Sequence, residues 1–435
     1  MTYIPNKNLA DAWEKGEKNS RYRWVIMAAW FVMMTINSIS LTNYPLALPA
    51  IAKGYNIEPN SLMYYAGILS YSLGLFVIYF VNKHGWLDTM VKYAIIFSQV
   101  AVIVPSFIIP FSTSYFEIVV LRFIQGLWFM ELALATIHLK GWFAKKDIAF
   151  ALAAPLSALV VGSAIGGLIE KEIVIISNWQ TGYIITGILT IVGSIIFIAL
   201  YKDAEGYNDY ILLNKQEREA MKGQHNCPPS WKLKVAYTIG FSQIATTMAF
   251  ASIPYLVPVI GYKVKYSLVA VSNTVFIYGI LAALMTLMGA LLGSYLVSKH
   301  QQAENIFKSR NLTRTLSYII AFIGFLLLVI IPYFHFYIIY LIGSIFSASI
   351  LFNIPNYWSE MGEVVPPSIS GDFIFFSGAV ASSGFFLGPL ITIYLIVIYK
   401  NIFEALLFFL IIIIVSQIIN IYQDHIKLPI EMYKD

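Results

Sequence analysis

The sequence predicts an all-α integral membrane protein with twelve transmembrane helices arranged as two parallel six-helix repeats. Apolar residues make up 59% of the 435 residues and charged residues only 12%, whereas soluble domains are near half apolar and a quarter charged. The apolar residues gather in stretches of about 20 residues, the length that a helix needs to cross the hydrocarbon core of a membrane. The longest internal polar segment, residues 201–234, divides these stretches six and six.

The predicted helices lack the polar face of a surface helix, so a soluble helical bundle is disfavoured. They cover residues 24–46, 62–81, 93–111, 116–139, 149–168, 179–200, 235–258, 268–297, 315–334, 337–358, 373–396 and 402–422. The chain then divides into a cytoplasmic N-terminal segment (1–23), an N-terminal six-helix half (24–200), a cytoplasmic central loop (201–234), a C-terminal six-helix half (235–422) and a cytoplasmic tail (423–435). Interleaved charges at 214–219 predict a short surface helix in the central loop.

Lys and Arg are unevenly distributed between the two sides of the predicted bundle. With the N-terminus inside, 22 of the 28 basic residues fall in the termini and inner loops, and five fall on the outer side. This excess predicts cytoplasmic N- and C-termini for a multi-pass protein, which we expect in the plasma membrane. Residues 1–23 show no apolar core and no cleavage site, so no removed signal peptide is expected. The net charge of +5 arises from the excess of Lys and Arg on the inner side of the membrane. It therefore does not indicate a nucleic-acid partner, and none is expected.

Two charges lie well inside the predicted helices, and both are on the fourth: Arg122 and Glu131. A charge deep in hydrocarbon is costly, so it is interpreted as functional. Arg122 suits a carboxylate substrate or an acidic partner, the alternative being bonds to backbone carbonyls of a neighbouring helix. Glu131 favours its neutral form in an apolar setting and can carry a proton, the alternative being a neutral acid bonded to a neighbour. Nine residues place the two on opposite sides of a regular helix, about 13 Å apart.

Amide side chains in the predicted helices are further candidates for substrate contact, because each offers donors and acceptors. They are Gln125 on the fourth helix, Asn37 on the first, Gln243 on the seventh, and Asn353 and Asn356 on the tenth. Hydrogen bonding between helices is the alternative for each of them.

Glycine pairs with small-xxx-small spacing occur on the fifth, eighth and eleventh predicted helices. They are Gly162 and Gly166, Gly289 and Gly293, and Gly384 and Gly388. Such faces let helix backbones approach closely in lipid. We expect tight packing at these faces, with helices five and eight approaching each other.

A short segment repeats at the matching position of the two halves. YFVNKH at 79–84 recurs as YLVSKH at 295–300, an offset of 216 residues, and each copy ends the second helix of its half. Two parallel six-helix halves are a transporter architecture in which the substrate site lies at the midplane between the halves. In the adjoining loops Asn82, Lys83 and Gly85, and then Ser298 and Lys299, are candidate gating residues.

Over nearly its whole length the chain resembles the major facilitator superfamily. Arg122, Gln125 and Gly126 match the helix-four signature of that family, and Trp142-Phe143 follows at the typical spacing. The signature between helices two and three departs from the family, since Asn82 replaces its Asp and the leading Gly and trailing basic residues are missing. The resemblance therefore implies a gate that relies more on packing than on the usual charge latch.

Other segments extend this resemblance. Gly162 with Gly166-Gly167 is similar to the glycine-rich fifth helix of the family, and Gly388-Pro389 is similar to its eleventh. RYRW at 21–24 and ERE at 217–219 resemble the anion:cation symporter branch. Helices one, four, seven and ten line the central cavity in this family, which implies that most of the candidate amides face a substrate.

Enzyme function is disfavoured because the loops carry no nucleophile elbow, phosphate loop or Cys/His cluster. A single Cys227 excludes a disulfide framework and a Cys-based metal site, and no catalytic residue, metal or cofactor is expected. The acidic loop of Glu360, Glu363 and Asp372 is interpreted as a solvated gate.

The sequence thus predicts a secondary active transporter that works by alternating access. Proton-coupled symport of a small organic anion or related metabolite is the favoured function, with a monomer in the lipid bilayer binding substrate and protons. A proton-driven exporter or a uniporter of a neutral or amphipathic compound is the alternative. A non-transporting receptor or scaffold is the alternative of another class, and the buried charges argue against it because a scaffold has no use for them.

Overall fold

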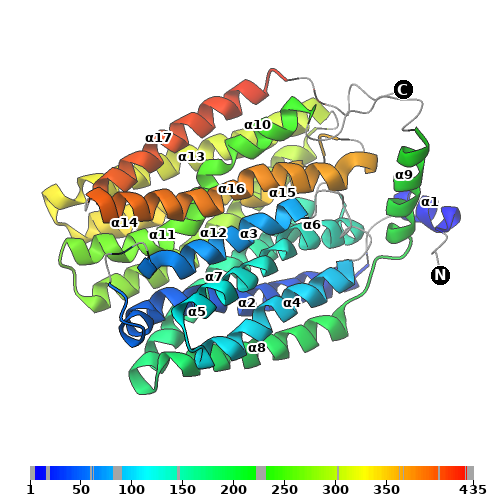
Figure 1. Ribbon diagram of the computed structural model, residues 1–435. Helices are drawn as coiled ribbons and strands as arrows, with labels where there is room; N and C mark the ends of the chain where they lie inside the picture. Colours follow the sequence, from blue (N-terminus) through cyan, green and yellow to red (C-terminus); the bar gives the residue numbers. More distant parts are fainter. Residues whose placement is uncertain are drawn as a thin grey trace.

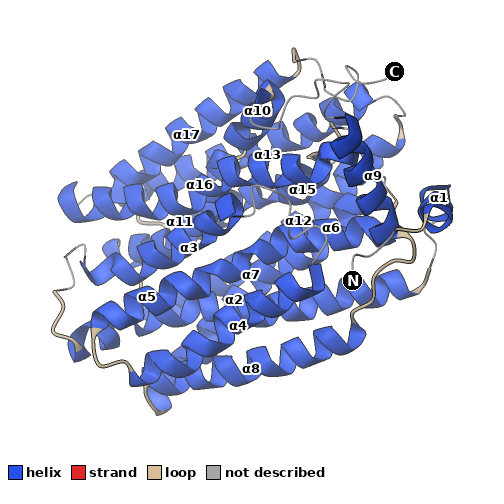
Figure 2. Cartoon of the chain, turned by 45° about the vertical axis from the view of Figure 1, so that its right-hand side comes forward, coloured by secondary structure: helices blue, strands red, loops and turns tan. Residues whose placement is uncertain are grey.

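The structure, a computed structural model, is a bundle of long helices that lie side by side (Figure 1). It describes residues 5–15, 20–58, 61, 63–81, 91–144, 147–221, 232–300, 303–361, 363–365, 367–399, 402–426 and 428. Every regular element in these residues is helical (Figure 2). Ten helices in the described part of the chain are long and apolar enough to cross a membrane.

The helices follow the predicted order. The six of the N-terminal half are α2 (Tyr22–Gly54), α3 (Ala66–Val81), α4 (Val91–Ile108), a helix four in several pieces, α7 (Ile148–Ile176) and α8 (Trp179–Leu200). Those of the C-terminal half are a broken helix seven, α12 (Leu268–Ser298), α13 (Ala303–Phe334), a broken helix ten, α16 (Pro367–Tyr399) and α17 (Ile402–Gln423). Short 3-10 turns, η1 (Met63–Tyr65) and η3 (Ile109–Phe111), adjoin α3 and α4.

Helices four and ten are interrupted at corresponding places, which the sequence did not predict. Helix four runs as α5 (Tyr115–Gly126), the 3-10 segment η4 (Leu127–Met130) and α6 (Glu131–Trp142). Helix ten runs as α14 (Tyr337–Ala348), the 3-10 segment η6 (Ser349–Asn353) and α15 (Ile354–Glu360). A 3-10 stretch inside a long helix often marks a hinge. Glu131 directly follows the first interruption, and Asn353 ends the second.

Helix seven is also divided, at a single turn. α10 (Lys234–Ser242) ends before Gln243, and α11 (Ile244–Lys263) begins after it. Discontinuous helices in transporters expose backbone and side-chain groups near the substrate site. The break places the Gln243 side chain at the meeting point of two helix ends.

Two short helices lie beyond one end of the bundle, α1 (Lys7–Lys15) and α9 (Tyr207–Met221) (Figure 1). α9 is longer than the predicted surface helix at 214–219. The backbone nitrogen of Asn6 donates to Asp209 over 2.6 Å, and Trp13 Nε1 donates to the Gly141 carbonyl over 2.9 Å. These bonds attach the start of the chain and α9 to the end of helix four.

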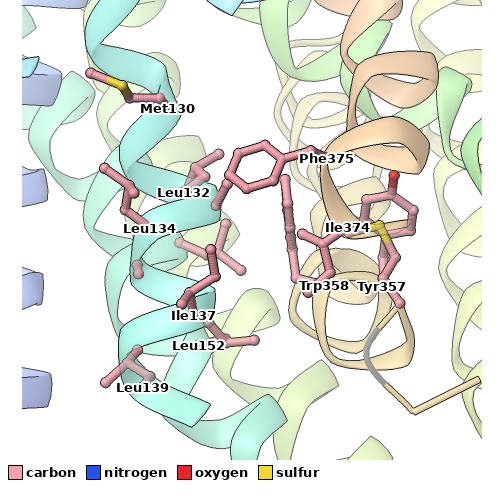
Figure 3. Packing of buried hydrophobic residues seen from close by; sticks show 14 of the residues in the cluster. Met130, Leu132, Leu134, Ile137, Leu139, Leu152, Tyr357, Trp358, Ile374 and Phe375 are labelled. Carbon is pink, nitrogen blue, oxygen red and sulfur yellow. The ribbon is translucent and has the colours of Figure 1, made fainter. Parts of the chain in front are cut away.

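An apolar cluster of residues from both halves lies at the end of the bundle where helix four finishes. Figure 3 shows Leu132 and Ile137 of α6 facing Phe375 of α16 and Trp358 of α15. α7 packs along α12, and α3 packs along α16. Two pairs of helices therefore form the interface between the halves, one pair on each side.

The predicted glycine faces pack tightly, but the partner helices differ from those expected. A Cβ at Gly162 would meet the Thr35 carbonyl of helix one, and a Cβ at Gly289 would meet the Phe352 carbonyl of helix ten. Helices five and eight instead approach at Gly279, where a Cβ would lie 2.6 Å from Ala164. The expected pairing of helices five and eight through Gly162 and Gly289 is therefore wrong.

The remaining glycines of the three pairs lie at similar crossings. A Cβ at Gly293 would meet Asn356 of helix ten, and Cβ atoms at Gly384 and Gly388 would meet Thr247 and Met248 of helix seven. Gly166 is buried within α7.

We expect Gly289→Leu and Gly162→Leu to lower the stability of the inserted protein by about 1–3 kcal/mol or more, because a backbone carbonyl cannot move aside for a side chain. Thermal unfolding in detergent, together with the amount of protein recovered from membranes, measures the effect. Gly167→Leu is the matched control, since a Cβ there meets no atom within 4 Å. Equal unfolding temperatures for all three variants would show that the two tight crossings are not needed.

Candidate functional site

Arg122 lies in an aromatic cage within the N-terminal half. Its side chain is 1% exposed, and its guanidinium carbon is 4.8 Å from the ring centroid of Tyr44 and 4.2 Å from that of Tyr71. Its Nη1 donates to Gln125 Oε1 over 2.8 Å. Its Nε has no hydrogen-bond partner, and no carboxylate lies within ion-pair distance of it, in the part of the chain that the structure describes. A buried cation without a counter-ion is costly, and it can be compensated by an anionic ligand.

Hydrogen bonds hold the walls of this cage in place. The Tyr44 and Tyr115 hydroxyls are 2.6 Å apart, and Trp128 Nε1 donates to the Tyr71 hydroxyl over 2.5 Å. Gln125 in turn donates to Ser106 Oγ over 3.1 Å. The sequence indicated Arg122 and Gln125, but Tyr44, Tyr115 and Ser106 were missed because nothing in their local pattern separates them from other membrane residues.

Glu131 lies in a second, separate polar cluster and is fully buried. Asn37 Nδ2 on helix one donates to Glu131 Oε2 over 3.0 Å. Ser98 and Gln99 on helix three both donate to Glu131 Oε1, and Ser194 on helix six donates to Gln99 Oε1 over 2.7 Å. The carboxyl group therefore joins helices one, three, four and six. Asn37 was a sequence candidate, whereas the three partners from helices three and six were not.

Arg122 and Glu131 share no partner residue. Arg122 contacts Gln125 and the two tyrosines, and Glu131 contacts Asn37 and the polar residues of α4. Both side chains thus lie in the N-terminal half. The structure places a buried guanidinium and a buried carboxyl group in the same half, at different positions along helix four.

A narrow cavity lies between the two halves, beside the three broken helices. Its described lining is apolar and aromatic apart from three neutral polar residues, Gln243, Thr247 and Ser382. The other lining residues are Phe129, Leu132, Leu156, Leu159, Phe250, Ile354, Tyr357, Trp358, Ala381 and Phe385. Arg122 and Glu131 are not among them, although Phe129 and Leu132 flank Glu131 on the same helix. Among the predicted site residues that the structure describes, only Gln243 lines this cavity.

The amide of Gln243 is oriented by helix ten. Asn353 Nδ2 donates to Gln243 Oε1 over 3.1 Å, and Thr313 Oγ1 donates to Asn353 Oδ1 over 3.1 Å. Gln243 Nε2 has no partner among the described residues. Asn356 lies elsewhere, because it donates to the Gly289 carbonyl over 2.8 Å and accepts from Arg310 over 2.7 Å. The structure therefore joins Gln243 with Asn353, and it separates Asn356 from them.

The C-terminal half contains a buried ion-pair cluster that the sequence did not predict, because the ninth helix was expected to begin only at residue 315. α13 begins at Ala303, so Arg310 and Arg314 are inside a helix and fully buried, not in an inner loop. Arg310 pairs with Glu363 over 2.8 Å, and Arg314 pairs with Glu360. Glu360 is fully buried, so it does not belong to a solvated gate. The side chain of Asp372 lies outside the described residues.

The Arg314 side chain is also bound by neutral groups. Its Nη1 donates to Asn420 and Gln423 of α17, each over 2.8 Å, and to Ser242 at the end of α10 over 2.9 Å. These partners lie far apart in the sequence. Such neutral partners lower the cost of burying the ion pair, although Arg314 Nε and Glu360 Oε1 have no hydrogen-bond partner among the described residues.

Glu360→Leu should destabilise the protein by about 3–5 kcal/mol, because it leaves the Arg314 cation buried without its carboxylate. Thermal unfolding in detergent measures the change. The matched control is Glu304→Leu, which breaks an exposed pair with Lys308 on the same helix α13 and should cost at most about 1 kcal/mol. A similar loss in both variants would show that the Arg314–Glu360 pair does not stabilise this end of the bundle.

The candidate gating residues form no common site in the described part of the chain. Asn82, Lys83 and Gly85 lie outside the described residues. Ser298 donates to the Tyr295 carbonyl in its own helix over 2.7 Å, and Lys299 Nζ lies 4.1 Å from the Tyr295 ring centroid.

Comparison with known proteins identifies the family. The family model described as Major Facilitator Superfamily matches residues 30–389. The human organic anion transporter MFSD10 (TETRAN) has a similar structure, with a TM-score of 0.69 and 11% identity, covering 92% of this chain and 99% of that one. The proton:xylose symporter XylE, bound to 6-bromo-6-deoxy-D-glucose, has a TM-score of 0.70 and 10% identity, covering 92% of this chain and 95% of that one.

No curated protein matches the sequence. At identities of 10% and 11%, the two structural neighbours show the fold alone. The family match over most of the chain confirms the predicted class, an all-α membrane transporter with the twelve-helix architecture, and it excludes an enzyme. The chain belongs to the major facilitator superfamily.

Proposed function

We propose that this transporter carries a small organic anion together with a proton. The observation that carries the proposal is Arg122, a buried guanidinium held by two tyrosine rings without a carboxylate partner among the described residues. A guanidinium presents a planar set of donors that matches a carboxylate or phosphate. An organic anion entering the bundle would complete the charge balance at this position.

Glu131 supports the proton-coupled part of the proposal. It is a fully buried carboxyl group in hydrogen-bond contact with three side chains, all of them neutral. Its ionised form becomes less costly when water reaches it, so opening of the bundle to alternate sides allows release and uptake of a proton. Arg122 and Glu131 lie on the same helix. One movement of helix four can therefore act on the bound anion and on the bound proton together.

The test of the anion proposal is a thermal-shift screen of the purified protein against metabolite pools divided by charge. A ligand that binds only the folded state raises the unfolding temperature, and at 100 times its Kd it adds about 2.7 kcal/mol of stability. We expect hits among small organic anions, and we expect Arg122→Lys to reduce those shifts. Hits confined to neutral compounds would contradict the proposal.

A second candidate is export or facilitated passage of a neutral or amphipathic compound. The uncharged aromatic lining of the central cavity favours it, because such walls bind apolar surface and offer one free amide donor at Gln243. Neutral hits whose shifts are unchanged in Arg122→Lys would support this candidate.

We also infer that the protein lies in the plasma membrane as a monomer. We infer that both ends of the chain face the cytoplasm. The inside excess of Lys and Arg supports this orientation. Cys227, the single cysteine, should then react with a membrane-impermeant thiol reagent only after the cells are opened. Labelling of intact cells at Cys227 would reverse the orientation.

A further inference from the structure

The Ser98 hydroxyl lies between two acceptors, one of which is the Glu131 carboxyl group. Its Oγ is in hydrogen-bond contact with Glu131 Oε1 and 2.7 Å from the Ile95 carbonyl of its own helix. A hydroxyl carries one proton, so it donates to one of these acceptors at a time. With Glu131 ionised, Ser98 donates to the carboxylate. With Glu131 protonated, the acid donates to Ser98 Oγ, and Ser98 turns its proton to Ile95, so both charge states are satisfied without movement of heavy atoms.

Gln99 presents its amide nitrogen to the same oxygen. Its Oε1 accepts from Ser194 Oγ, which lies 2.7 Å from it and 2.6 Å from the Thr190 carbonyl, and its Nε2 faces Glu131 Oε1. Asn37 likewise presents its Nδ2 to Glu131 Oε2 over 3.0 Å. The two amides therefore present donors to the carboxyl group, and donors stabilise its ionised form.

The charged and titratable groups nearest along helix four are occupied elsewhere. Arg122 is held by Gln125 and the tyrosine cage. His138 accepts from Trp30 Nε1 over 3.0 Å and lies 2.8 Å from the Lys202 carbonyl. The contacts to Glu131 from α2 and α4 are all made by neutral side chains, and Ser194 of α8 reaches it through Gln99. Burial and hydrogen bonds to neutral groups, and not charges on neighbouring described residues, therefore set the balance between its two forms.

We propose that Ser98 and Gln99 are positioning residues that set the pH at which Glu131 releases its proton. Ser98 is a two-position hydroxyl switch, and Gln99 is an amide donor whose oxygen contacts Ser194 on helix six. This inference rests on the proposed role of Glu131 as the proton carrier. It assigns to helices three and six a part in proton binding that is separate from the substrate site.

Infrared difference spectroscopy of the purified protein tests the proposal without a substrate. A protonated carboxyl group gives a carbonyl band that disappears as the pH rises. The band that is missing in Glu131→Gln belongs to Glu131. In Ser98→Ala and in Gln99→Met the midpoint of this band should move to higher pH by about one unit, because the ionised form loses one charge-assisted hydrogen bond. Ser98→Thr keeps the hydroxyl and should keep the midpoint.

Gln417→Met is the matched control, since Gln417 bonds Thr315 in the other half. Its midpoint should equal that of the unchanged protein. Equal midpoints in all variants would overturn the proposal, as would a Glu131 band that does not titrate while the protein is folded. The proposed role of Glu131 in proton coupling is tested separately, by measuring whether Glu131→Gln still accumulates substrate in response to a pH gradient. Failure of the coupling role can therefore be distinguished from failure of the role of Ser98 and Gln99.

Discussion

Glu131→Gln should abolish accumulation of substrate driven by a pH gradient while leaving exchange of substrate largely intact. Glutamine has nearly the same shape and stays neutral. Its single carbonyl oxygen can accept the hydrogen bond of Ser98, while its NH2 group takes the place of Oε2 and can donate to the Asn37 oxygen once that amide is turned over. The variant therefore resembles the protonated protein permanently. A transporter locked in the neutral form can still move between its two open states with substrate bound, but it cannot use the proton gradient, because nothing is released.

Two assays on reconstituted vesicles separate these steps. Uptake against a concentration difference, driven by an imposed pH gradient, reports coupling, and exchange between preloaded vesicles and labelled substrate reports binding and movement. Glu304→Gln is the control, because Glu304 is an exposed carboxylate paired with Lys308 on α13. Reconstituted Glu131→Gln protein that still concentrates substrate in response to pH would remove Glu131 from the mechanism.

The positions of the membrane helices were predictable from the sequence, because a stretch of about 20 apolar residues has few alternatives in a chain of this composition. α8 spans Trp179–Leu200, which is the predicted range, and α12 differs from its prediction by one residue. The interruptions at η4 and η6 were not predictable, because Leu127–Met130 and Ser349–Asn353 have the same composition as the helices around them. Packing against other helices, and not local preference, decides where such a helix tightens.

Arg310 and Arg314 illustrate a second limit. Two arginines within five residues lower the local hydropathy, so the sequence pattern placed the start of the ninth helix after them, at residue 315. In the structure their charges are compensated by Glu363, Glu360 and the amides of α17, which lie 46 to 109 residues away along the chain. Compensation over such separations is a property of the fold. A reading of local hydropathy cannot detect it.

The candidate site was predictable only in part, for the same reason. Arg122 and Glu131 stand out because a charge in hydrocarbon is conspicuous in any sequence. Their partners Tyr44, Ser98 and Gln99 are ordinary residues of other helices, and only the three-dimensional arrangement brings them to the charge. The amides Gln243 and Asn353 were correctly singled out as polar, but their mutual hydrogen bond depends on the breaks in helices seven and ten.

Arg122→Lys should weaken binding of an anionic substrate roughly ten- to a hundredfold, the equivalent of about 1.5–3 kcal/mol for a lost charged hydrogen bond. Lysine keeps the positive charge but loses the planar fork that binds two oxygen atoms together, and it also loses the flat face that lies against Tyr44 and Tyr71.

Thermal shift or equilibrium binding with the purified variant measures the loss at Arg122. Arg23→Lys is the matched control, because Arg23 also stacks on aromatic rings, Trp24 at 5.1 Å and Phe143 at 5.5 Å, at the other end of the N-terminal half. Affinity for the anion should fall in the first variant and stay unchanged in the second. If Arg122→Lys binds the anion as tightly as the unchanged protein does, charge alone is enough at this position. Unchanged binding by Arg122→Met as well would mean that Arg122 does not bind the substrate, and its cage would then serve only to hold helix four against helices one and two.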